Sequence, residues 1–84
     1  GLIALACIGG ESGKYLSRAF NQVSLQDAIQ GDGERWMLED QDNGRVALGC
    51  VGGESGKYLS HAFNQVSLQD AIQGDGEKWM KQEL

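Results

Sequence analysis

The feature that most constrains this chain is an internal repeat of 43 residues. When the 84-residue sequence is aligned with itself after a shift of 43 positions, 31 of the 41 aligned pairs are identical. Between Gly9–Glu34 and Gly52–Glu77 only Arg18 and His61 differ. A repeat of this length is one supersecondary unit that cannot bury its apolar face alone. The sequence therefore predicts two tandem units, residues 1–43 and 44–84, in one small domain.

Each unit reads as four short strands separated by turns. In the first unit, apolar and small residues alternate over residues 3–7, and further strand-like runs cover residues 14–19, 23–26 and 35–38. Glycine-rich loops at residues 9–13 and 31–33, and a turn at residues 21–22, separate them. One alternative stays open, because Ser24 is a suitable cap for a short helix that would end at Gly31. The spacing favours an all-β protein.

The segment between the units is polar and ends in a turn signal. It runs from Glu39 to Gly44 and closes with the pair Asn43-Gly44, which favours a tight hairpin turn. The 13 glycines and the absence of proline also indicate many tight turns. Cys7, Cys50, Trp36 and Trp79 fall on strands, where we expect them to be core residues.

Charge narrows the range of partners. A formal net charge of −5 disfavours nucleic acid, because phosphate binding requires a basic face. The same charge disfavours anionic membranes, and no run approaches the length of a membrane span. The apolar opening residues lack a basic flank and make a poor signal peptide, which favours the cytoplasm without establishing a compartment.

Two matching segments carry a resemblance to a known family. Gly13-Lys14-Tyr15-Leu16-Ser17 recurs as residues 56–60, and each copy is followed by a strand and a tryptophan. This pattern resembles the β-trefoil repeat, especially its fascin-like and hisactophilin-like group, over essentially the whole chain. The resemblance implies four strands per repeat and three repeats around a pseudo-threefold axis. The alternative with two motifs of this size is the βγ-crystallin domain, but its calcium signature is absent from the sequence.

The resemblance also implies that two repeats are one short of closure. An incomplete trefoil-like domain would leave unpaired strand edges and an open core, and both are costly. We therefore expect a homo-oligomer with closed symmetry. Three chains supply six repeats, enough for two trefoils, so a trimer is the favoured assembly.

Motifs for catalysis, cofactors and metals are weak. His61 adjoins Ser60, but neighbours on a strand point to opposite faces, so a nucleophile–base pair is not expected. The loop before Tyr15 lacks the spacing of a phosphate-binding loop. Two distant cysteines do not form a zinc site, and the short acidic runs lack the spacing of a calcium loop. We expect no enzyme, no cofactor and no metal.

Polar side chains beside the repeated tyrosine suggest a carbohydrate site. An aromatic ring can cover a pyranose face while carboxylates and carboxamides bond its hydroxyl groups. The residues expected to bind ligand are Tyr15, Asn21, Gln22, Asp27 and Asp32, with Tyr58, Asn64, Gln65, Asp70 and Asp75 as their counterparts. Repeated sites give avidity for repetitive ligands such as glycans. Two alternatives remain: an actin-associated protein, as the fascin-like resemblance implies, and an engineered symmetric scaffold without a ligand.

Overall fold

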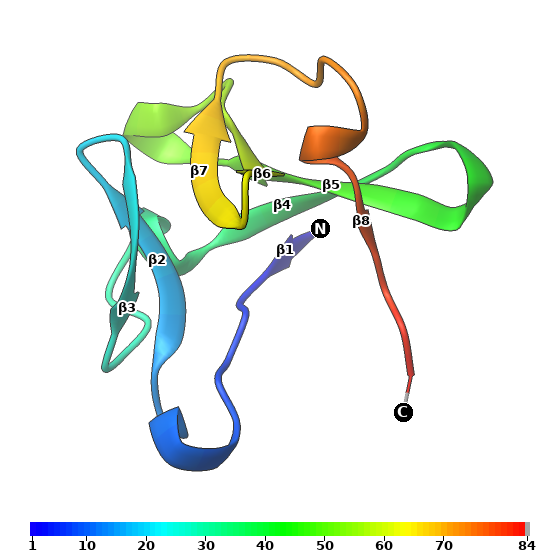
Figure 1. The fold of residues 1–84 in the computed structure, drawn as a ribbon. Coiled ribbons are helices and arrows are strands. Elements are labelled where there is room, and N and C mark those ends of the chain that lie inside the picture. Colours follow the sequence, from blue (N-terminus) through cyan, green and yellow to red (C-terminus); the bar gives the residue numbers. More distant parts are fainter. Residues whose placement is uncertain (84) are drawn as a thin grey trace.

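The fold consists of short strands connected by tight turns. The computed structural model describes residues 1–83, so Leu84, the last residue of the second predicted repeat, lies outside the described residues. The strands are β1 (Leu2–Ile3), β2 (Tyr15–Ala19), β3 (Gln22–Gln26), β4 (Trp36–Asp40), β5 (Arg45–Cys50), β6 (Tyr58–Ala62), β7 (Gln65–Gln69) and β8 (Trp79–Met80) (Figure 1). Single 3-10 turns cover Gly9–Glu11, Asp32–Glu34, Asp42–Gly44, Gly52–Glu54 and Asp75–Glu77.

The second and third strands of each repeat form one hairpin. In β2–β3 the register runs from Tyr15 opposite Gln26 to Ala19 opposite Gln22, and β6–β7 repeats it 43 positions later. The loop residues Phe20 and Asn21 have left-handed φ angles of 52° and 63°, as a two-residue hairpin turn of the primed type requires. The turn expected at residues 21–22 is therefore one residue earlier, and Gln22 begins β3.

The two repeats are joined by a longer hairpin. Strand β4 pairs with β5 over five positions, from Trp36 opposite Cys50 to Asp40 opposite Val46. Asn43 and Gly44 form the turn with φ angles of 58° and 73°, which confirms the turn predicted from this dipeptide. The predicted linker was too long, because residues 39–40 extend strand β4.

The strands form one sheet of six and one of two. The larger sheet has the order β1-β4-β5-β6-β7, with β8 also paired to β5, and the smaller sheet is β2–β3. No helix among residues 1–83 exceeds three residues, which confirms the all-β prediction and makes the helical alternative after Ser24 wrong, since Ser24 lies in β3. Nothing in the described residues forms a helix long and apolar enough to cross a membrane. The compact architecture is compatible with a β-trefoil-like fold.

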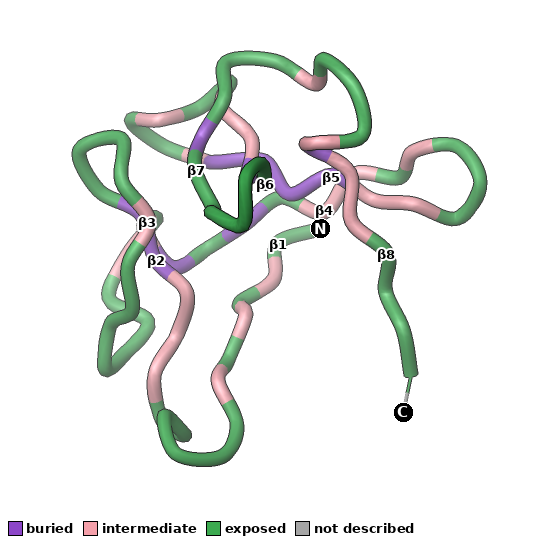
Figure 2. The backbone as a smooth tube through the Cα atoms, viewed as in Figure 1, coloured by how far each residue is buried: buried purple, intermediate pink, exposed green. Residues whose placement is uncertain are grey.

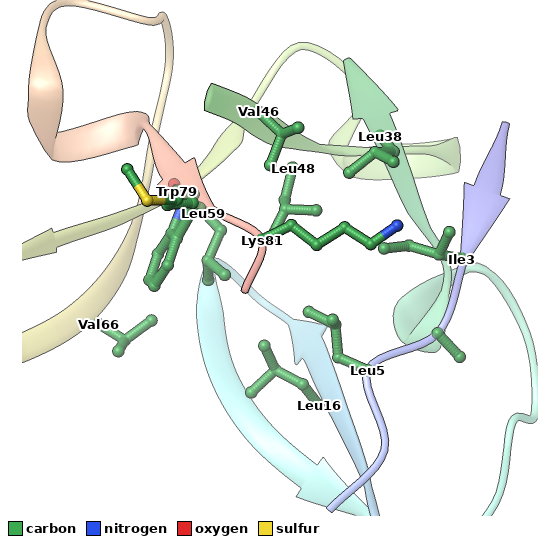
Figure 3. A pocket seen from close by; sticks show the side chains of 12 residues that line it. Ile3, Leu5, Leu16, Leu38, Val46, Leu48, Leu59, Val66, Trp79 and Lys81 are labelled. Carbon is green, nitrogen blue, oxygen red and sulfur yellow. The ribbon is translucent and has the colours of Figure 1, made fainter. Parts of the chain in front are cut away.

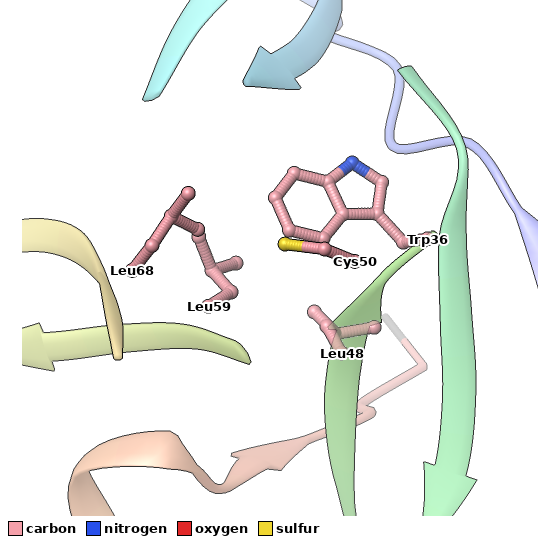
Figure 4. Close-up of a cluster of buried hydrophobic side chains, with 5 residues drawn as sticks. All are labelled: Trp36, Leu48, Cys50, Leu59 and Leu68. Carbon is pink, nitrogen blue, oxygen red and sulfur yellow. The ribbon is translucent and has the colours of Figure 1, made fainter. Parts of the chain in front are cut away.

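The core lies where the two repeats meet. Its buried side chains are Trp36, Leu48, Cys50, Leu59 and Leu68 (Figure 4). The Trp36 side chain is fully buried, and its indole nitrogen donates to the Leu16 carbonyl at 3.2 Å.

In each pair of equivalent core residues, only one member is buried. Cys50 and Trp36 are buried as expected, whereas Cys7 and Trp79 are only half-buried. Buried backbone is concentrated in the central strands such as β5, while the loops are mostly exposed (Figure 2). Both cysteines are free thiols.

Candidate functional site

The ten predicted ligand residues occupy equivalent places in the two repeats, but they do not form one cluster. Tyr15 begins β2 and lies opposite Gln26, the last residue of β3. Asp27 follows immediately and accepts a hydrogen bond of 2.6 Å from the Lys14 amine. This bond lowers the pKa of Asp27, whose side chain is largely exposed. Tyr15 and Asp27 therefore lie at the open end of the hairpin.

Asn21 and Gln22 lie at the opposite end of the same hairpin. Strand β2 has five residues, and a rise of about 3.3 Å per residue separates the two ends by roughly 15 Å. A monosaccharide cannot contact both ends at once. The second repeat has the same division, with Tyr58 and Asp70 at one end and Asn64 and Gln65 at the other.

The remaining two aspartates lie in the 3-10 turns before the tryptophan strands. Asp32 packs against the second repeat, because a β-carbon built on Gly52 would lie only 2.5 Å from its Oδ2 atom. Asp75 lies 3.4 Å from the Arg45 guanidinium. Both aspartates are exposed, and neither lies on the hairpin that carries Tyr15 or Tyr58.

A polar groove at the junction of the repeats brings Tyr58 together with a carboxylate. Its volume is about 320 Å³. The lining residues are Met37 and Glu39 of β4, Gly49 and Cys50 of β5, and Val51, Ser55, Gly56, Lys57 and Tyr58. We call this the Tyr58 groove.

The groove depends on Gly49. A β-carbon built there would lie 3.2 Å from Glu39 Oε2 and 3.3 Å from Tyr58 Cε1. The missing side chain therefore lets the Tyr58 ring and the Glu39 carboxylate approach the same stretch of β5. On the other side, Lys57 donates to Asp70 at 2.6 Å. The Tyr58 ring, the Glu39 carboxylate and the Lys57 side chain, whose ammonium group is paired with Asp70, thus line one groove. An aromatic ring beside a carboxylate is chemistry suited to a hydroxyl-rich ligand.

The corresponding surface of the first repeat is incomplete. Tyr15 bridges Ala6 as Tyr58 pairs with Gly49. However, β1 pairs only with β4, at the positions where β5 pairs with β8. Among the described residues, no strand runs beside Ala6 as β4 runs beside Gly49. The wall that Glu39 supplies at Tyr58 is therefore missing at Tyr15.

Sequence reasoning missed two sets of residues. Glu39 was assigned to the linker, although the Asn43-Gly44 turn would have indicated that the flanking residues pair as strands. Phe20 and Phe63 were not singled out, yet they are 95% and 96% exposed at the hairpin tips. A bulky residue with a left-handed φ angle is uncommon, and no sequence signal predicted it.

A buried carboxylate in each repeat stabilises the loop before the tryptophan strand. Glu34 accepts hydrogen bonds from the Ser17 hydroxyl and from the backbone amides of Gln30 and Gly31, at 2.8 and 3.2 Å for the amides. These bonds, with that from Ser17 foremost, lower the pKa of Glu34. Glu77 repeats the arrangement with Ser60, Gln73 and Gly74. The same geometry in both repeats indicates a structural role.

The other chemically interesting groups are also engaged structurally. Burial raises the pKa of the Cys50 thiol, so it is protonated at neutral pH and a poor nucleophile. His61 lies against Trp79 with ring centroids 4.9 Å apart, and its Nε2 is 3.2 Å from the Lys78 carbonyl. Within residues 1–83, no three His, Cys, Asp or Glu side chains group as a metal site.

No protein-family model and no curated protein matches the chain.

Proposed function

We propose that this protein is a multivalent, non-catalytic binding protein and that its ligand is carbohydrate. The observation that carries the proposal is the Tyr58 groove, where the Tyr58 ring and the Glu39 carboxylate approach the same stretch of β5. A sugar ring stacks on an aromatic face, and its hydroxyl groups bond both donors and acceptors. The repeat supports multivalency only through the hairpins, since Tyr15 and Tyr58 have the same hairpin setting, while the complete groove lies at Tyr58.

The chain's charge favours a neutral ligand. At a formal net charge of −5, an uncharged glycan meets no long-range repulsion. Association with actin, suggested by the fascin-like resemblance, is the alternative. It is less favoured, because the acidic surface of actin would face an acidic chain. Co-sedimentation with filamentous actin distinguishes the two.

The direct test is a glycan array followed by titration calorimetry on the ligand identified. We expect Tyr58→Ala to weaken binding about tenfold, because stacking on an aromatic ring contributes roughly 1 kcal/mol or more. Glu39→Gln keeps the shape of the groove and should weaken binding less. Circular dichroism confirms that each variant is folded.

The matched control is Phe63→Ala, which removes an exposed ring at the far end of the same hairpin. It should leave the affinity unchanged. An array without any glycan bound would refute the proposal. Loss of binding in the Phe63 variant but not in the Tyr58 variant would move the site to the hairpin tip, beside Asn64 and Gln65, and so contradict the groove.

A further inference from the structure

Two hollows lie on opposite faces of the paired strands β4 and β5. One is an apolar cavity of about 590 Å³ on the core side, whose lining includes Leu38 and Leu48 (Figure 3). The other is the Tyr58 groove, whose lining includes Glu39 and Gly49. Successive side chains of a strand point to opposite faces, so Glu39 alternates with Leu38 and Gly49 alternates with Leu48. Binding in the groove therefore leaves the core side of these strands unchanged.

Glu39 differs from the other carboxylates that are at least partly buried. Within residues 1–83 its carboxylate takes part in no hydrogen bond and no ion pair. By contrast, Glu34 and Glu77 accept hydrogen bonds from serine hydroxyls, and Glu54 lies 3.4 Å from the backbone amide of Asn21. A charge that is partly withdrawn from water without a partner is unfavourable. A cation bound at this position would supply the partner.

The Tyr58 ring offers a cation a second interaction at the same place. A β-carbon built on Gly49 would lie 3.2 Å from Glu39 Oε2 and 3.3 Å from Tyr58 Cε1, so the carboxylate and the ring border one small space. The absent side chain of Gly49 keeps this space open. An ammonium group over an aromatic ring, within about 6 Å of its centre, is attracted by the negative face of the ring. A carboxylate beside the ring strengthens this preference for a positive charge.

The charges around the groove also favour a cation. Of the described residues that line it, only Lys57 is cationic, and its amine donates to Asp70 at 2.6 Å. This hydrogen bond, foremost, and the negative charge of Glu54 raise the pKa of Lys57. Asp70 thus balances the charge of Lys57, whereas no lining residue balances the charge of Glu39. The net charge of −5 on the whole chain attracts cations as well, while it neither attracts nor repels neutral groups.

We propose that the Tyr58 groove binds a protonated amine, and that its glycan ligand is an amino sugar whose amino group is free. This inference rests on the proposed carbohydrate function and narrows it to one class of sugar. The ammonium group donates a charge-assisted hydrogen bond to the Glu39 carboxylate and lies against the Tyr58 ring. Acetylation of the amine removes its charge and so weakens binding. An acidic sugar is disfavoured, because its carboxylate would face that of Glu39.

The charged part of this site occurs in one repeat only. The 43-residue repeat aligns Glu39 with Gln82. Among the described residues, no strand beside Ala6 places a carboxylate near Tyr15. The preference for an amine therefore belongs to the Tyr58 groove alone. It also follows that Glu39→Gln, which removes the charge and retains the shape, is the informative substitution.

Titration calorimetry at pH 6, where the sugar amine is protonated, tests the proposal with two matched probes. They are a glucosamine oligosaccharide and the N-acetylglucosamine oligosaccharide of the same length, which differ only at the amino group. We expect the wild-type chain to bind the free amine at least threefold more tightly, because a charge-assisted hydrogen bond is stronger than a neutral one. Glu39→Gln should bind the free amine about threefold less tightly, with the affinity for the acetylated probe unchanged.

Glu11→Gln is the matched control, because it removes the same charge from an exposed turn of the first repeat. It should retain the preference for the free amine. Circular dichroism confirms that both variants are folded. Equal affinity of the wild-type chain for the two probes would overturn the proposal, and so would a preference that survives Glu39→Gln. An equal loss in Glu11→Gln would also overturn it, because long-range charge alone would then explain the preference.

The amine site and the carbohydrate function can fail separately. Tighter binding of the acetylated probe, lost in Tyr58→Ala, would refute the amine site and retain the carbohydrate function. Butylammonium serves as a probe without a sugar, followed through the amide resonances of Gly49 and Tyr58. If it shifts these resonances while neither oligosaccharide binds, the amine site stands and the carbohydrate function is refuted. If none of the three probes binds, both are refuted.

Discussion

The buried carboxylates give the sharpest test of how each repeat is stabilised. Glu34 accepts three hydrogen bonds, and two of them come from backbone amides of the loop before β4. In Glu34→Gln the amide oxygen can still accept from the backbone, and the amide nitrogen can donate to Ser17. What changes is the charge, since hydrogen bonds to ionised groups contribute about 1.5–3 kcal/mol and neutral ones about 1 kcal/mol. A loss of roughly 0.7 kcal/mol for each of three bonds predicts destabilisation of about 2 kcal/mol.

Thermal unfolding followed by circular dichroism measures this loss. For a domain of this size, 1 kcal/mol corresponds to about 4–8 °C in Tm, so we expect a decrease of roughly 10 °C at pH 7. Glu77→Gln should behave alike, because its contacts are the same. Glu11→Gln, on an exposed turn, is the control and should change the stability by less than about 0.5 kcal/mol.

The dependence on pH supplies the decisive result. The pKa of Glu34 is lowered in the folded protein, so the ionised side chain stabilises the fold fully at pH values above the ordinary pKa of glutamate. This stabilisation is lost as the pH falls from that value through the lowered one. The difference between the wild-type protein and Glu34→Gln should therefore shrink towards zero in acid. A difference that stays constant with pH, or one below about 0.5 kcal/mol at pH 7, would refute the reasoning.

Four further substitutions test packing, backbone strain and surface charge, each by denaturant unfolding. Trp36→Phe should lower the free energy of unfolding by about 2 kcal/mol or more, and Trp79→Phe should lower it clearly less, because of these two side chains only Trp36 is fully buried. Equal losses in the two variants would contradict the asymmetry of the core. Gly52→Ala should destabilise the protein by at least about 1 kcal/mol, because the φ angle of Gly52 is 75° and the new β-carbon would collide with Asp32. An unchanged denaturant midpoint would show that the alanine is not strained at this position. Lys57→Met should cost less than about 1 kcal/mol, as expected for an exposed ion pair, and a larger loss would show that the pair is structural.

Much of the architecture could be predicted from local sequence. The two repeats, the all-β class and the Asn43-Gly44 turn follow from self-similarity, alternation and the preference of that dipeptide for left-handed φ angles. The hairpin loop was placed one residue late, because a phenylalanine such as Phe20 is not expected at a positive φ angle. The candidate site was predicted only in part: Tyr58 lines the groove, but its sequence neighbours Asn64 and Gln65 lie at the other end of the hairpin.

The sequence by itself determined the pattern of strands and turns within each repeat. The tertiary structure decided which residues of each repeat are buried and how long its strands are. Leu25 and Leu68 have the same neighbours in sequence, yet only Leu68 is buried. Strand propensity cannot distinguish β1 from β5, because near-identical segments have near-identical local preferences. The difference arises from which partner strand lies alongside, since backbone pairing and apolar burial are interactions between segments distant in sequence. The same reason explains why Glu39 meets Tyr58 in a groove, whereas no strand among the described residues places a carboxylate beside Tyr15 in this way.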